Sequence, residues 1–97
     1  MGLVNSDVEN RSFLMQIAKE LRAAEIDEMK FLLEGEAVDK MRLKSASVCE
    51  FVRILGEQQY WSFYPTVNFF GFALLCKKLK RHDLAKHLKN YGKKEEF

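Results

Sequence analysis

The 97 residues of this chain suffice for one domain with a single hydrophobic core, and we expect that domain to span residues 1–97. Hydrophobic residues make up 47% of the sequence and charged residues 31%, which excludes an intrinsically disordered class. The formal net charge is only +2. One proline and five glycines disfavour a many-stranded sheet and favour helices joined by short connections.

The amino-terminal segment predicts the first helix. Ser6–Glu9 fits a capping box, in which the serine hydroxyl and the glutamate carboxylate accept hydrogen bonds from early backbone N–H groups. The helix is expected to run to about residue 21, and its apolar side holds Phe13, Leu14, Ile17 and Leu21. Residues 1–6 also fit the pattern for N-myristoylation at Gly2, but one myristoyl chain anchors a protein only marginally. Because no apolar run is long enough to span a membrane either, we expect no membrane partner.

The stretch from Glu25 to Leu33 predicts a short amphipathic helix that carries a large apolar residue on its outer face. Its core-facing arc is formed by Ile26, Met29 and Leu33. Phe31 points roughly 170° away from that arc and Leu32 roughly 90° away. The charged residues of the outer face are Asp27, Glu28, Lys30 and Glu34. The outward ring is a candidate contact for another protein, unless a neighbouring loop covers it or it is one of the isolated apolar residues common on surfaces.

A weak element and a clear helix are predicted next. Gly35 suits a helix end in the left-handed conformation. Residues 36–44 predict a short helix or a loop, because charged residues outnumber its apolar ones, which are Ala37, Val38, Met41 and Leu43. Ser47–Glu50 is a second capping box, and it opens a helix that we expect to end at Gly56. The inward residues of that helix are expected to be Val48, Phe51, Val52 and Leu55.

Residues 58–65 are unusually aromatic and read Gln-Gln-Tyr-Trp-Ser-Phe-Tyr-Pro. Two interpretations remain open for this segment. A hydrophobic loop can fold down and cover the end of a helical bundle. Alternatively, the aromatic residues form a contact patch, because tyrosine and tryptophan anchor many protein interfaces.

A helix that is apolar on nearly every side is predicted over residues 66–80, with Pro65 in its first turn. Such a helix belongs in the middle of a bundle, and Gly71 would permit a neighbouring helix to cross closely. A last helix is expected to follow a break at 81–82 and to end at Gly92, and its apolar residues are Leu84, Leu88 and Tyr91. Residues 92–97 would then form a flexible tail beyond a domain core of about 6–91. The sequence therefore predicts an all-α, six-helix antiparallel bundle whose third helix is short or weak.

Neither catalysis nor metal binding is indicated. Cys49 and Cys76 lie in helical apolar patterns without CxxC spacing, so we expect buried free thiols in a reducing, cytoplasmic compartment. His82 and His87 are five residues apart and do not share a helix face. No HExxH motif, phosphate loop or serine elbow is present. We predict a protein with no catalytic residues, no metal, no cofactor and no small-molecule substrate.

Charge is distributed unevenly along the chain. Residues 1–76 hold 8 Lys and Arg against 11 Asp and Glu, a net charge of −3, whereas residues 77–97 hold 8 against 3, a net charge of +5. This polarity can steer one molecule head to tail onto a copy of itself. The alternative is nucleic-acid binding through the basic residues Lys77, Lys78, Lys80, Arg81, Lys86, Lys89, Lys93 and Lys94, although no known docking motif is evident. Solvated lysines are the third interpretation.

Several of these features together resemble a death effector domain, a member of the death-fold superfamily. They are the six-helix pattern, Glu25 six residues before Phe31, the run Lys30–Leu32, and the Arg-His-Asp-Leu sequence that opens the last helix. The resemblance covers about residues 10–91. It separates this subfamily from the related death, pyrin and caspase-recruitment domains.

The resemblance implies a non-catalytic interaction module in apoptosis signalling, which either recruits or blocks its partners. Those partners are other death-effector-domain proteins, either adaptors or initiator caspases. The family's charge triad falls on Glu25, Arg81 and Asp83, and its partner-binding residues fall on Phe31 and Leu32, which form the exposed patch, and on Lys30. In such domains the patch docks into a groove between helices one and four of a partner, and chains of these contacts build filaments. The triad either contacts the partner or only fixes the packing of the helices. The aromatic residues at 60–64 and the basic, then acidic tail depart from the family pattern.

Overall fold

The computed structural model describes residues 2–35 and 39–94, and the side chains of residues 7–35 and 39–91. The described part contains six helices and no strand beyond an isolated bridge between Ser62 and Asn68. The helices are α1 (Gly2–Glu20), α2 (Ala23–Leu33), α3 (Lys40–Lys44), α4 (Val48–Glu57), α5 (Phe70–Lys78) and α6 (His82–Lys94). The predicted six-helix, all-α bundle with a short third helix is confirmed.

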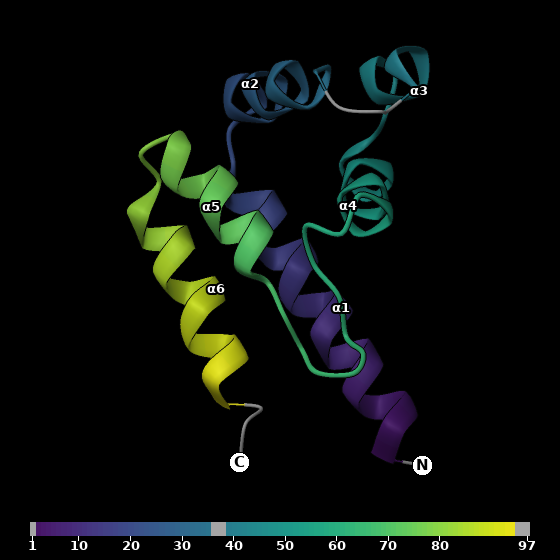
Figure 1. Cartoon of the computed structure of the whole chain (residues 1–97), viewed down its shortest axis with the longest axis vertical. Helices are drawn as coiled ribbons and strands as arrows, with labels where there is room; N and C mark the ends of the chain where they lie inside the picture. The colour runs from purple at the N-terminus through teal and green to yellow at the C-terminus, as the bar shows by residue number, and fades with distance from the viewer. Residues whose placement is uncertain (1, 36–38, 95–97) are drawn as a thin grey trace.

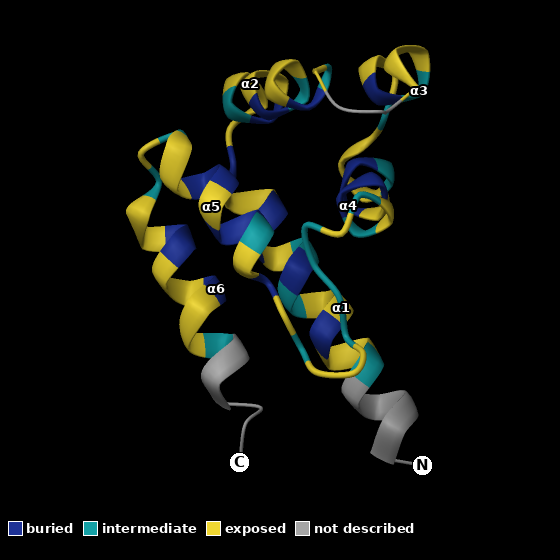
Figure 2. Cartoon of the chain, in the orientation of Figure 1, coloured by how far each residue is buried: buried dark blue, intermediate teal, exposed yellow. Residues whose placement is uncertain are grey.

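Figure 1 shows two packed pairs of helices and two further helices, α2 and α3. α5 and α6 form a hairpin and pack against each other, and α1 packs on α4. α2 and α3 lie toward the end of the molecule that is opposite to both chain termini. Figure 2 shows that buried residues gather on the sides of the helices that face one another. The fully buried large side chains come from all six helices and include Leu14, Ile17, Met29, Leu33, Leu43, Phe51, Phe72, Leu84 and Leu88.

The helix ends are determined by capping side chains and by the connecting loops more than by the positions of glycine. Ser47 caps α4, because its Oγ accepts a hydrogen bond from the N–H of Glu50 at 3.1 Å. No described glycine has a positive φ, so the predicted left-handed stop at Gly35 is wrong. The left-handed residues are instead Gln59 (φ 65°) and Lys80 (φ 64°), which follow the last turns of α4 and α5. The predicted stops at Gly56 and Gly92 are also wrong, because α4 runs to Glu57 and α6 to Lys94.

The starts of α1 and α5 differ most from the predictions, whereas α2 begins at Ala23, two residues before the predicted Glu25. α1 begins at Gly2, so Ser6 lies inside the helix and not at its cap position. Residues 3–5 contain no proline or glycine, so nothing in them interrupts the helix before Ser6. α5 begins at Phe70 and not at residue 66. The reason is that Ser62 and Asn68 exchange backbone hydrogen bonds of 2.9 and 2.8 Å, which keeps Pro65 in a loop. The carboxamide of Asn68 then accepts the N–H of Phe70 at 2.9 Å.

Burial corrects three further predictions. α5 is not covered on every side, because Phe70 is 57% exposed and Leu74 is 40% exposed. Val48, in the first turn of α4, is 37% exposed, and the neighbouring Cys49 is exposed too, so only Cys76 is a buried thiol. Burial raises the pKa of the Cys76 thiol to about 12. The predictions for Ala37, Val38 and residues 95–97 lie outside the described residues.

The aromatic segment 58–69 folds onto the body of the molecule as a connecting loop between α4 and α5. The indole N–H of Trp61 donates to the carbonyl of Val52 at 2.8 Å, and its ring lies against Gly56. Gly71 admits the backbone of this loop and not a neighbouring helix, since a Cβ there would lie 2.8 Å from the Cα of Tyr60. Tyr64 stays 63% exposed, and its hydroxyl is bonded to the carboxylate of Asp7 at 3.2 Å. The covering interpretation of the loop therefore holds for Trp61 but not for Tyr64.

The fit between Gly56 and Trp61 predicts that Gly56→Ala destabilises the fold. A methyl group at residue 56 would lie 2.5 Å from Cζ2 of Trp61, and the indole cannot retreat without losing its hydrogen bond to Val52. We expect a loss of about 2 kcal/mol in the free energy of unfolding, typical of an overpacked site. Urea titration followed by the fluorescence of Trp61, the single tryptophan, measures it.

The matched control for this prediction is Gly35→Ala. Its added methyl group would have no heavy atom nearer than 3.9 Å, so we expect little change in stability. Equal effects of the two substitutions would contradict the account of the Trp61 contact.

Candidate functional site

Arg81 lies at the junction of α5 and α6 and joins the three residues of the predicted charge triad. Its Nη1 donates to Oε1 of Glu25 at 2.7 Å. Its Nε and Nη2 bind the two carboxylate oxygens of Asp83, each at 3.1 Å. Nη1 also donates to the carbonyl of Glu20 at 3.3 Å, at the end of α1. The planar guanidinium thus holds two carboxylates and a carbonyl at once, which a lysine ammonium cannot do with the same geometry.

Glu25 serves two interactions at the start of α2. Its Oε1 accepts the backbone N–H of Arg22 at 2.8 Å, which closes the first turn, and it accepts Nη1 of Arg81. The Arg22 N–H, and then the charge of Arg81, hold the pKa of Glu25 below its usual value. Hydrogen bonds from Arg81 lower the pKa of Asp83 to about 2, and the same pairing raises the pKa of Arg81 further. All three groups are therefore ionised at neutral pH.

The other end of α2 is held by Lys30. Its Nζ donates to the carbonyl of Ala46 at 3.0 Å, in the connection between α3 and α4. Lys30 is half-buried, and its ammonium group is directed to the Ala46 carbonyl and not fully into solvent. α2 buries only Ile26, Met29 and Leu33, which makes these polar ties at both ends important for its orientation.

Phe31 and Leu32 lie on the outward side of α2. The side chain of Phe31 is 72% exposed and that of Leu32 is 41% exposed. Asp27 and Glu28 are exposed on the same helix, and Glu34 is half-buried. We call Phe31 and Leu32 with these carboxylates the α2 patch. Exposing such an apolar pair to water is unfavourable, so covering it with another surface lowers the free energy of the complex.

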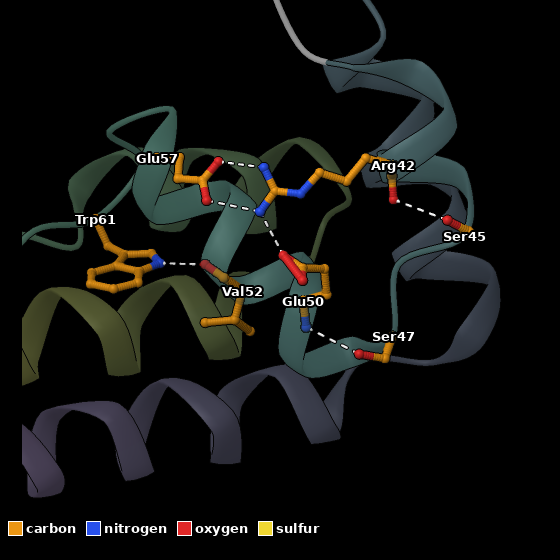
Figure 3. Close-up of polar contacts among 7 residues, drawn as sticks. All are labelled: Arg42, Ser45, Ser47, Glu50, Val52, Glu57 and Trp61. Carbon is orange, nitrogen blue, oxygen red and sulfur yellow. Dashed lines mark hydrogen bonds and ion pairs between the residues drawn. The ribbon is translucent and has the colours of Figure 1, made fainter.

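Arg42 forms a second ionic cluster that the sequence analysis missed. It joins α3 to α4 through Nη2–Glu50 and Nη1–Glu57 contacts of 2.6 Å each (Figure 3). The hydrogen bonds from Arg42 lower the pKa of Glu57. The three residues are 8 and 15 positions apart on two helices, so no local spacing could have revealed the cluster. Met41, the neighbour of Arg42, is 79% exposed.

A pocket of about 180 Å³ lies between α1 and α4, and a shallow depression continues from it along α1. The pocket is lined by Arg11, Leu14, Met15, Cys49, Val52, Arg53 and Trp61. The depression is lined by Val8, Arg11, Ser12, Met15, Gln16 and Lys19. We call the two together the α1–α4 groove. Its lining residues include three basic side chains and no carboxylate, so it is electrostatically opposite to the α2 patch.

The aromatic loop builds one side of this groove. Trp61 is a wall of the pocket, and it is fixed by its hydrogen bond to Val52 (Figure 3). Arg11 lies over the ring of Phe63, with Cζ 5.6 Å from the ring centroid, which sets the position of a basic side chain at the rim. Phe63 in turn contacts Phe69, which stacks with Tyr91 of α6 at 5.6 Å between ring centroids. The loop is therefore anchored on both sides.

The lysines of the predicted nucleic-acid surface lie on α5, α6 and the turn between them. Those with described side chains are exposed and include Lys77, Lys78, Lys80, Lys86 and Lys89. Arg81 differs from them, because it is half-buried and engaged in the triad. Lys93 and Lys94 lie in the last turn of α6, but their side chains are not described.

The described residues contain no cluster of three or more His, Cys, Asp or Glu side chains that could hold a metal ion. Within the same residues, none of the helices combines the length and the apolar character that a membrane span requires. The features that the structure does provide are an exposed apolar patch, a basic groove and the ionic clusters that hold the helices. These are the features of a helical protein-interaction domain.

Comparison with known proteins identifies the family of this domain. A family model described as "Death effector domain" matches residues 10–94. No curated protein and no solved structure matched the chain. Because the family model covers most of the sequence, the chain belongs to the death effector domain family. Members of this family are homotypic protein-interaction modules in death signalling.

The triad predicts a pH-dependent contribution of Arg81 to stability. The pKa values of Glu25 and Asp83 are lower in the folded chain than their ordinary values of 4.5 and 3.8. The stabilisation is therefore complete above those ordinary values and is lost as the pH falls through the folded values, down to about 2 for Asp83. We expect Arg81→Gln to be less stable than the wild type near neutral pH, with a difference that narrows as the pH approaches that lower value.

Urea unfolding of both proteins across this range measures the difference. A stability difference that stays constant between neutral pH and the pKa of Asp83 would contradict the ionic account of Arg81.

Proposed function

We propose that this domain associates with other death effector domains, including copies of itself, by placing its α2 patch in the α1–α4 groove of the next molecule. The 72% exposure of Phe31 carries this proposal. The ring is held outward by a helix that is tied at both ends, through Arg81–Glu25 and through Lys30–Ala46. A patch on such a helix is pre-organised, so less conformational entropy is lost when it binds.

The size of the groove supports a phenyl ring as its occupant. An apolar cavity of about 150 Å³ accepts a benzene molecule, and the pocket between α1 and α4 has about 180 Å³. Its walls are largely apolar and include Leu14, Met15 and Trp61. A buried aromatic anchor in such a pocket is the usual centre of binding energy in a protein interface.

Charge supports the same pairing. Asp27 and Glu28 flank Phe31 on α2, and Arg11 and Arg53 flank the pocket. Opposite charges at the rim of an interface accelerate association and select the correct orientation, while they add little affinity by themselves. Lys30, which the sequence predicted to bind the partner, donates to the carbonyl of Ala46 in this structure. In the proposed assembly it would act with the triad by positioning the patch, without direct contact to the partner.

The patch and the groove are different surfaces of one molecule, so the contact is heterologous. A heterologous contact that does not close on itself produces an open chain of molecules. Such chains would bring partner domains of an adaptor or an initiator caspase together, which is the role that family membership suggests. The basic side chains of the groove, Arg11, Lys19 and Arg53, all lie in residues 1–76, so this contact does not use the basic carboxyl-terminal part of the chain.

The substitution Phe31→Asp tests the patch. We expect the folded variant to self-associate at least about thirtyfold more weakly, because it loses the aromatic anchor and puts a carboxylate in its place. Analytical ultracentrifugation measures the association, and circular dichroism checks the fold. The matched control is Met41→Asp, which removes an even more exposed apolar residue, 79% exposed on α3. If the control weakens association as much as Phe31→Asp, the assignment to the α2 patch is wrong.

A mixing experiment tests the pairing of patch with groove. Arg53→Glu is expected to impair the groove, because its carboxylate would face Asp27 and Glu28 of the incoming patch and like charges across an interface repel strongly. It leaves the patch intact, whereas Phe31→Asp does the reverse. Each variant alone should remain monomeric, while an equimolar mixture should form a dimer that does not grow further. A mixture that stays monomeric would refute a heterologous contact between these two surfaces.

A further inference from the structure

One side of α5 is uncovered and combines apolar with basic side chains. Phe70 and Leu74 are 57% and 40% exposed and lie one helical turn apart, so they share a side of the helix. Lys77 and Lys78 are exposed and continue the same stripe, seven and eight residues after Phe70. The sequence predicted a helix in the middle of the bundle and no membrane partner, so the exposed apolar pair was not expected, although Lys77 and Lys78 belonged to the predicted basic surface.

The turn and helix that follow extend the positive charge. The exposed lysines of this region are Lys77, Lys78, Lys80, Lys86 and Lys89. In the part of the chain that is described, the ion pairs are those of Arg42 and Arg81, so none of these lysines is neutralised by a carboxylate. Between residues 77 and 89 the one acidic residue is Asp83, and Arg81 already holds it at 3.1 Å. α5 and α6 pack against each other, and Figure 2 shows exposed segments of both on one face.

We infer that the α5–α6 hairpin is a peripheral binding site for an anionic membrane surface, independent of the groove and of the α2 patch. Phe70 and Leu74 would enter the boundary between headgroups and acyl chains, and the five lysines would lie at the level of the anionic headgroups. Phenylalanine and leucine next to a lysine-rich surface are the composition of interfacial membrane-binding helices. The negative potential of an anionic leaflet attracts each lysine that comes close to it.

Other partners fit this surface less well. Protein interfaces are depleted in lysine and enriched in arginine, tyrosine and tryptophan, whereas the basic residues free on this surface are lysines. Nucleic-acid phosphates would attract the lysines equally, but they offer nothing to an exposed leucine such as Leu74. An anionic lipid surface satisfies both the charge and the apolar pair.

Vesicle co-sedimentation of the whole chain tests this inference. The probes are large vesicles of phosphatidylcholine with phosphatidylserine, and vesicles of phosphatidylcholine alone. We expect binding to the anionic vesicles that weakens as salt is added. Lys77→Gln and Lys78→Gln should each lower the partition coefficient about fivefold, and Phe70→Ser should lower it about tenfold. Circular dichroism confirms that each variant is folded.

A matched control comes from α3, which also carries an exposed apolar residue beside two exposed lysines. The combined substitutions Met41→Ser, Lys40→Gln and Lys44→Gln should leave vesicle binding nearly unchanged. Phe31→Asp should also bind vesicles normally, so failure of the proposed assembly and failure of this inference are distinguishable.

Three outcomes would overturn the inference. The first is equal binding to both kinds of vesicle, or none. The second is that binding to duplex DNA depends on Lys77 and Lys78 but not on Phe70, while vesicle binding is also independent of Phe70. That result would assign the face to the phosphates of a nucleic acid. The third is loss of self-association without vesicles in Phe70→Ser, which would assign it to a protein contact.

Discussion

The interaction on which the arrangement depends most is the one between the Arg81 guanidinium and Glu25. Through its guanidinium, Arg81 connects three helix ends. It binds Glu25 in the first turn of α2, Asp83 at the start of α6 and the carbonyl of Glu20 at the end of α1. α2 contributes only three buried residues to the core, so apolar packing alone constrains its rotation weakly. The ion pair at its first turn and the Lys30 hydrogen bond near its last turn therefore determine where Phe31 points. In the proposed assembly the triad would act through this geometry, without contacting the partner.

The aromatic loop has a comparable role on the opposite surface. Its tryptophan is fixed by the carbonyl of Val52 and by the absence of a side chain at Gly56, and it forms a wall of the pocket between α1 and α4. Arg11 is placed at the rim by the ring of Phe63. The aromatic residues of this loop thus have a physical consequence, because they shape the surface into which a partner's side chain would fit. Substitutions in this loop would change the shape of that surface, and with it the choice of partner, without changing the fold.

The fold and the outward position of Phe31 were accessible from the sequence, because helical periodicity depends on apolar residues close together in the chain. Arg81, Glu25 and Asp83 were brought together only by resemblance to a family, since residues 56 positions apart carry no local pattern. The Arg42 cluster had no such resemblance to support it and was missed. The exposure of Phe70, Leu74 and Cys49 could not be predicted either, because periodicity shows that a residue is apolar but not whether another element covers it.

The central claim is that the α2 patch of one molecule lies in the α1–α4 groove of another, and site-directed cross-linking tests it most directly. Cys49 is exposed and lines the pocket, so it can serve as the native acceptor. A tagged chain carrying Leu32→Cys and Cys49→Ser is mixed with the wild type and treated with a short bismaleimide, and the linked peptides are identified by mass spectrometry. We predict a link between position 32 of the tagged chain and Cys49 of the untagged one, well above the yield from a tagged chain with Met41→Cys in place of Leu32→Cys. Equal yields from the two chains, or no link to Cys49, would contradict the account.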